Sequence, residues 1–199
     1  MKNTHRRVIV LSTLITVLTL TSALLLALAP APLSADASSS LFAIDAPQTM
    51  EAIFQTDSPV RTARWRYVYV HHSRTTSGNA MSLAKNPDGL GDHFVIGNGD
   101  GCMDGEIQVG QRWNKQLSAA PPAGASDIDP DCISICLVGD FDRSVPTPTQ
   151  LRRLQQLTTA LQGRLRINGK NVLLIDQANN VAGAGRYFPT TVFRGQLLP

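Results

Sequence analysis

Two adjacent histidines, His71 and His72, close a strand-like run of apolar and aromatic residues, "WRYVYVHHS" at positions 65–73. A third histidine, His93, follows directly after Asp92, so three of the chain's four histidines lie in one short stretch. Imidazole nitrogens hold zinc or act as general bases near neutral pH. Zinc takes three or four protein ligands, however, so one histidine is not enough. No Ser or Cys nucleophile stands visibly beside Asp92 and His93, which argues against a catalytic pair there.

The histidines depend on strands to position them. Alternation along 65–73 predicts a strand with Tyr67, Tyr69 and His71 on one face and His72 on the other, toward the core or a neighbouring strand. Three further segments read as strands. Residues 92–113 read as a hairpin-like pair of strands joined by a Gly/Asp/Asn loop. Continuous apolar runs at 132–141 and 171–176 read as single strands.

One helix has a strong start signal. Thr147 can cap it, Pro148 takes the first helical position, and Gln150 completes a capping box. Gly163 marks the predicted end. The apolar face is formed by leucines at helical spacing, Leu151, Leu154, Leu157 and Leu161. Strands interleaved with this helix predict an α/β domain on a central sheet.

The N-terminus has the pattern of an export signal or a membrane anchor. A basic leader is followed by an apolar run at 8–29, which is long enough to span a bilayer, and then by small residues. We expect residues 1–37 to be a signal peptide or an N-terminal anchor. The protein is then exported to the periplasm or cell envelope. If the segment is not cleaved, it anchors the protein in the inner membrane, and it is the only part expected to contact the membrane.

The rest of the chain is expected to be a tether at 38–60 and one domain at 61–199. The net charge of +3 comes largely from the leader, and no basic stripe with interleaved aromatic residues follows it. Nucleic-acid binding is therefore not expected.

The three cysteines, Cys102, Cys132 and Cys136, are an odd number for an exported chain, so at least one does not pair within it. Cys132 and Cys136 share one face of a predicted strand, about 13 Å apart, which is too far for a disulfide. Pairing of Cys102 with either remains open. Cys136, in an apolar strand, is expected to be a small buried side chain.

Several strings match one known family in order: "VHHS", "GLGDHFVIGNGDG", "DGEIQVGQRW", "ICLVGDFD", "PTPTQL" and "GRYFP". Together they resemble the type 2 N-acetylmuramoyl-L-alanine amidases, which share their fold with peptidoglycan recognition proteins and phage T7 lysozyme. The resemblance covers residues 64–194. It implies a central mixed β-sheet flanked by helices on both faces, with a groove for the stem peptide of peptidoglycan.

In this family, zinc held by two histidines and one cysteine activates the water that hydrolyses the amide between muramic acid and L-alanine. The resemblance places the first histidine at His71. Without a gap, Ile175 falls at the second histidine and Gly183 at the cysteine, and neither side chain has a donor atom. Val181 falls where the family has a basic or polar residue that stabilises the transition state. Asp92 falls where it has a tyrosine that assists the water.

With only one family ligand retained, at His71, we expect no zinc cofactor and no hydrolysis. The resemblance then implies a protein that binds peptidoglycan or a muropeptide in the inherited groove, with His71, Asp92 and His93 as groove candidates. The alternative is an active zinc amidase with a rearranged site, built from His71, Asp92 and a third ligand not identified from the sequence. A scaffold domain without any ligand is a further possibility.

Overall fold

The computed structural model describes residues 14, 16–19, 21, 47–84, 89–120, 129–174 and 183–199. The chain divides into two units, Met1–Ser38 and Ser39–Pro199. In the first unit the described residues are helical, and most of the predicted leader lies outside them. Among the residues described, no helix is both long and apolar enough to cross a membrane.

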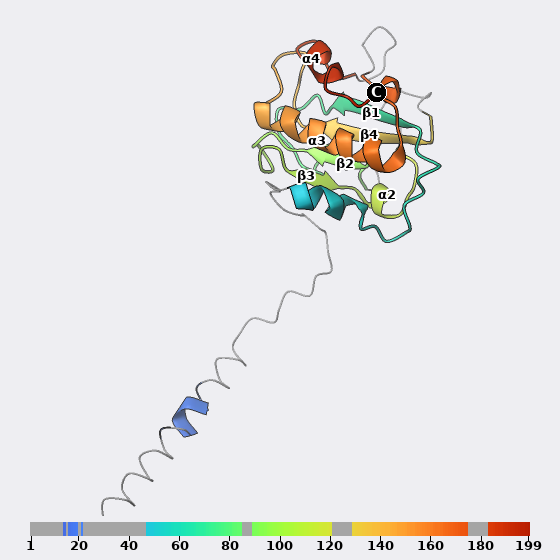
Figure 1. Cartoon of the computed structure of the whole chain (residues 1–199). Helices are drawn as coiled ribbons and strands as arrows, with labels where there is room; N and C mark the ends of the chain where they lie inside the picture. The colour runs from blue at the N-terminus through green and yellow to red at the C-terminus, as the bar shows by residue number, and fades with distance from the viewer. Residues whose placement is uncertain are drawn as a thin grey trace, which may run out of the picture. The chain divides into compact units, whose positions relative to one another are not determined.

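A five-stranded sheet forms the centre of the second unit, with the strand order β3–β2–β4–β1–β5 (Figure 1). Its strands are β1 Tyr67–His72, β2 Phe94–Ile96, β3 Ile107–Val109, β4 Cys132–Leu137 and β5 Val172–Leu173. β4 runs parallel to β1 and β2, β5 runs parallel to β1, and only β3 is antiparallel to its neighbour. The predicted α/β class with a mixed sheet is confirmed.

The long helix α3, Pro148–Leu165, begins as its sequence predicts. The Thr147 hydroxyl accepts a hydrogen bond from the Gln150 amide at 3.0 Å, and the Gln150 side chain accepts one from the Thr147 amide at 3.1 Å. The predicted end at Gly163 is wrong. The helix continues to Leu165, whose buried side chain extends the apolar face, and stops where Arg166 adopts a left-handed conformation.

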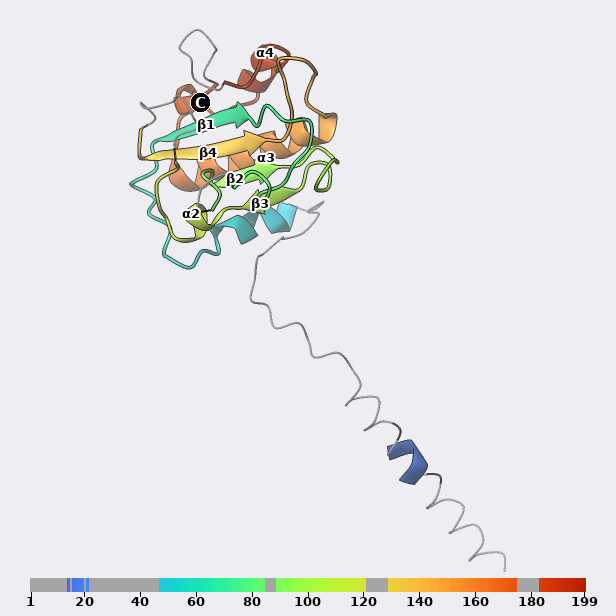
Figure 2. The ribbon, with the colours of Figure 1, turned by 180° about the vertical axis from the view of Figure 1, so that it is seen from behind.

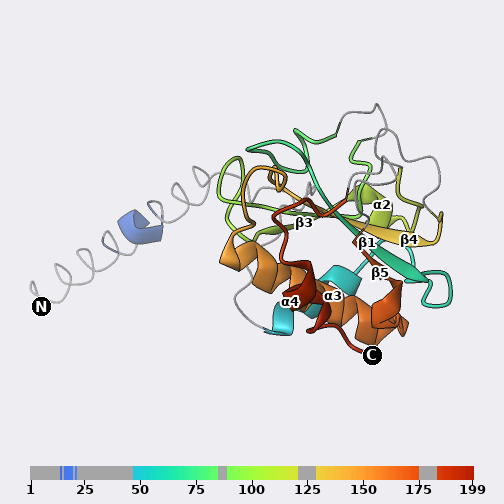
Figure 3. The same cartoon turned by 90° about the horizontal axis from the view of Figure 1, so that it is seen from above.

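Most of the described helices lie on one face of the sheet. Buried side chains from η1 (Pro47–Phe54), α3 and α4 (Thr190–Arg194) pack with those of the strands in one core, and α2 (Gln111–Asn114), on the other side of the strands, adds Trp113 to it (Figure 3). Leu154, Leu157 and Leu161 are fully buried there, each worth about 1.5–3 kcal/mol. A short 3₁₀ turn, η2 (Gly169–Asn171), precedes β5.

The other face of the sheet carries loops and the short helix α2. Seen from behind, the strands lie in front of α3 (Figure 2). A small cluster of Leu90, Val95, Cys136 and Val138 lies there, with Ala80 and Leu83 packed against it.

In its described part, 47–60, the expected tether at 38–60 differs from a linker; residues 38–46 lie outside the described residues. From Pro47 onward the chain packs on the domain: Ile53 is 4 % exposed in the main core, and its carbonyl accepts a hydrogen bond from the indole of Trp113. The Ser58 amide donates to the carbonyl of Asn114 at 3.0 Å. A short 3₁₀ segment has too few apolar residues for a periodic pattern, which is why composition alone favoured a linker.

Gly185 provides a test of how the C-terminal segment is held. Its φ is +96°, and a β-carbon there would lie 2.6 Å from the β-carbon of Phe141. We expect Gly185→Ala to lower the free energy of unfolding by about 1–3 kcal/mol in urea titrations, through strain and this clash. The matched control is Gly163→Ala, where nothing lies within 4 Å of the added carbon. It should raise stability by about 0.5–1 kcal/mol. Equal effects of the two changes would show that the close contact of Gly185 with Phe141 does not hold the C-terminal segment.

Candidate functional site

The parallel pairing of β1 with β4 brings several polar residues together on the face of the sheet away from α3, which we call the open face. His71 stands opposite Cys136 in the register, and Tyr69 stands opposite Ser134. Paired residues of parallel strands point to the same side, so all four side chains share this face. The predicted position of His71 on the face away from His72 is confirmed.

Asp92 reaches this row from the segment just before β2. Its Oδ1 lies 2.7 Å from Nε2 of His71 and also accepts a hydrogen bond from the hydroxyl of Ser134. The other ring nitrogen of His71, Nδ1, lies 3.3 Å from the carbonyl oxygen of His72. His71 and Asp92 have side chains only 6 % and 14 % exposed, so the pair is held almost out of water.

The electrostatics of this pair favour two opposite charges. Burial alone would lower the pKa of His71, but the charge and hydrogen bond of Asp92 outweigh it, and the pKa is raised. Burial alone would raise the pKa of Asp92, but His71 and the Ser134 hydroxyl hold it below its usual value. Both ring nitrogens of His71 face acceptors, which favours the protonated ring beside the carboxylate of Asp92.

Cys136 completes a group of three potential metal ligands. One atom each of His71, Asp92 and Cys136 lies within 4.8 Å of the others. Cys136 is 2 % exposed. The predicted burial of this cysteine is correct, but its place beside His71 and Asp92 was not expected from the sequence.

Tyr69 borders the same group. Its ring stacks on the ring of His71, with centroids 5.1 Å apart and planes 14° from parallel. Burial raises the pKa of Tyr69, and the charge of Asp92 raises it further. The hydroxyl is buried and finds no hydrogen-bond partner in the part of the chain that the structure describes.

His72 belongs to the core face, as predicted. Its Nδ1 accepts a hydrogen bond from the amide of Phe141 at 3.0 Å, and the two rings stack with centroids 5.6 Å apart. Burial lowers the pKa of His72, with the charge of Asp142 acting in the opposite direction. His72 therefore links the end of β1 to the segment after β4.

His93 is fully buried and does not line the open face. Its Nδ1 accepts from the amide of Ser134 at 3.0 Å, so the proton sits on Nε2, which donates to the carbonyl of Leu117 at 2.8 Å. Burial lowers its pKa to about 4. The expected groove role of His93 does not agree with this placement, which is that of a neutral structural histidine.

The family's zinc ligand set does not fit the described residues. Gly183 lies at the end of β1, where its carbonyl accepts a hydrogen bond from the amide of His72 at 3.3 Å, and it offers no side-chain donor. Ile175 and Val181 lie outside the described residues. Of the three ligand positions that the resemblance implies, the structure describes a donor side chain only at His71.

The family model for N-acetylmuramoyl-L-alanine amidases matches residues 61–186, which is more than half of the chain. The chain belongs to this family. Membership relates its function to peptidoglycan. The match spans β1 and β4 and ends at residue 186, just before Tyr187, whose amide donates a hydrogen bond to the carbonyl of Phe141.

A solved structure of low sequence identity shares the fold, and a second gives a weaker match. The N-acetylmuramoyl-L-alanine amidase LysC from Clostridium intestinale matches with a TM-score of 0.52 and 18 % identity, over 71 % of this chain and 91 % of LysC. Human PGRP-IBETAC in complex with glycosamyl muramyl pentapeptide matches with a TM-score of 0.46 and 20 % identity. This match covers 65 % of this chain and 82 % of the human chain. The comparison with curated proteins found no match.

Two residues of the site were missed by sequence reasoning, Ser134 and Cys136. Both lie in the apolar run of β4, where a continuous pattern hides which residues face the site. Their alternation with Ile133 and Ile135 was the available signal. It becomes informative only when the register to His71 is known.

Ser134→Ala tests the support of the buried carboxylate. We expect it to lower the free energy of unfolding by about 1–2 kcal/mol, because Asp92 loses a charge-assisted hydrogen bond in a dry environment. Chemical denaturation measures the change. Ser144→Ala, an exposed hydroxyl, is the matched control and should change stability by less than about 0.5 kcal/mol. A loss no larger than the control's would show that the hydroxyl does not support Asp92.

The three cysteines form no disulfide bond. Cys102 is only half-buried, whereas burial raises the pKa of Cys132 to about 12. We expect a thiol reagent to modify Cys102 first in the native protein, and Cys132 and Cys136 only on unfolding. Mass spectrometry of unreduced, unfolded protein should then show three modified residues, and fewer than three would reveal a disulfide.

Proposed function

We propose that this protein is exported to the cell envelope and binds peptidoglycan or muropeptides there without hydrolysing them through the family's zinc site. The observation that supports the proposal is the position of Gly183 at the end of β1, where the resemblance places the family's cysteine and this chain has no donor side chain. Family membership supports peptidoglycan as the ligand. The apolar leader at 8–29 supports export.

An exposed cation near the site fits this role. Arg74 follows β1 with its side chain exposed, and its backbone amide is fixed by the carbonyl of Gly139 at 3.0 Å. Its charge acts on the pKa of His71, His72 and Tyr69, so it lies within electrostatic reach of the site. Stem peptides of peptidoglycan carry carboxylates, which a guanidinium binds in bidentate geometry.

The proposal is tested with the full chain in detergent and purified sacculi. We expect the protein to sediment with the sacculi, titration calorimetry with soluble muropeptides to give heat, and an amidase assay to release no stem peptide. The absence of both retention and heat would refute binding. Release of stem peptides would refute the non-hydrolytic part of the proposal.

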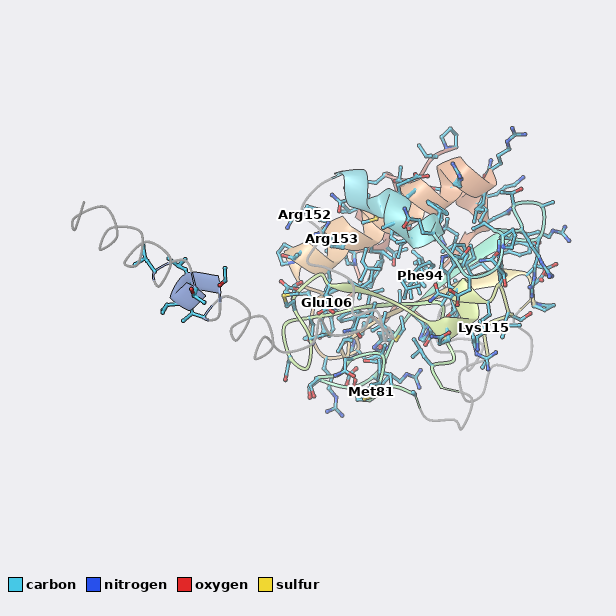
Figure 4. All side chains as sticks on the ribbon, turned by 90° about the horizontal axis from the view of Figure 1, so that it is seen from below. Met81, Phe94, Glu106, Lys115, Arg152 and Arg153 are labelled. Carbon is cyan, nitrogen blue, oxygen red and sulfur yellow. The ribbon has the colours of Figure 1, made fainter. Side chains whose placement is uncertain are left out.

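Arg74→Ala should weaken muropeptide binding about tenfold, because a charge-assisted contact with a carboxylate is worth about 1.4 kcal/mol or more. The matched control is Arg152→Ala, which removes the same charge from α3 on the other side of the sheet. Figure 4 shows Arg152 on that side and Met81 on the opposite one. An equal loss in both variants would mean that the arginines contribute only general charge attraction.

A second candidate function, an active amidase with a rearranged metal site, is favoured by one observation. The ligand atoms of His71, Asp92 and Cys136 lie within 4.8 Å of one another. The amidase assay separates this candidate from pure binding.

A further inference from the structure

We infer that His71, Asp92 and Cys136 form a zinc site whose ligand set differs from that of the family. Only His71 is common to both sets. The carboxylate comes from the position where the family has a tyrosine, and the thiol comes from β4 rather than from the C-terminal segment. The inference does not rest on the proposed binding function.

The donor set selects the metal. One imidazole nitrogen, one carboxylate oxygen and one thiol sulfur converge, and their atoms lie within 4.8 Å of one another. Calcium and magnesium prefer oxygen donors only, whereas zinc accepts all three types. Three protein ligands are also the number found in zinc sites that leave one coordination position open.

The nitrogen of His71 and the oxygen of Asp92 need only a small change in spacing to hold the ion. Two zinc bonds of about 2.0 Å at a tetrahedral angle place nitrogen and oxygen about 3.3 Å apart. In the structure Nε2 of His71 and Oδ1 of Asp92 are 2.7 Å apart, joined by the hydrogen bond that the ion would replace. Zinc takes the place of the proton between them and of the thiol proton of Cys136.

The groups behind the donors are already arranged as in a metal site. Nδ1 of His71 faces the carbonyl of His72 at 3.3 Å, the partner that a zinc-bound histidine commonly has on its second nitrogen. The hydroxyl of Ser134 donates to the carboxylate of Asp92 and orients it. Each of these bonds remains possible when the ion is bound.

Tyr69 supplies a second, independent observation. It is 0 % exposed, and its ring lies flat against that of His71, 5.1 Å between centroids. Its hydroxyl has no hydrogen-bond partner among the residues described. A buried polar atom without a partner costs about 1–3 kcal/mol, and a water on the open position of the ion would satisfy it.

Zinc content and cobalt spectra of the full chain, purified in detergent without an affinity tag, test the inference. After saturation with Zn²⁺ and gel filtration, we expect one zinc per chain by elemental analysis. X-ray absorption at the zinc edge should show one sulfur at about 2.3 Å and nitrogen or oxygen at about 2.0–2.1 Å. The Co²⁺-substituted protein should show a sulfur-to-cobalt charge-transfer band.

Cys136→Ser should abolish this band and weaken zinc binding more than tenfold, since even loss of a partner behind a ligand costs about 10–100-fold. Cys132→Ser is the matched control, a buried thiol on the same strand and face but outside the group. It should keep both the zinc and the band. Circular dichroism checks that each variant is folded.

No zinc in the wild type, or a zinc edge without sulfur, would overturn the inference, and neither measurement depends on a variant that folds. An unchanged band in Cys136→Ser would overturn it as well. Sacculus retention is measured separately on metal-free protein, so failure of the metal site and failure of peptidoglycan binding give different results.

Discussion

The parallel pairing of β1 with β4 is the constraint on which the candidate site depends. It sets His71 beside Cys136 and Tyr69 beside Ser134, and a shift by one residue would turn each of these side chains into the core. The apolar side chains of the same strands, packed against α3, fix that register. The geometry of the open face is therefore a consequence of packing on the opposite face of the sheet.

Asp92 then determines what the polar face contains. Placing a carboxylate in a nearly dry position is costly, and the arrangement offsets this cost with the charge of His71 and the hydroxyl of Ser134. A tyrosine at position 92 would bring no charge, and His71 would lose the partner that favours its protonated form. The replacement of the family's tyrosine by aspartate thus changes the chemistry of the site, not only one contact.

Sequence reasoning predicted the parts of this molecule that are coded locally. The alternation at β1, the Asn/Asp/Gly hairpin between β2 and β3, and the capping box of α3 all depend on neighbouring residues. The family followed from ordered strings. What could not be predicted depends on distant residues: Cys136 needed the β1–β4 register, and η1 needed the contact of Ile53 with Trp113. The helix end at Leu165 needed the core that its side chain enters.

The two faces of the sheet carry different groups. The side chains of Val68, Val70 and Leu157 belong to the main core, whereas Cys136 belongs to the small cluster on the other face. The match to the family over 61–186 includes residues of both faces. Reactivity follows from a few side chains on the other face, so here fold and chemistry have to be argued from different residues.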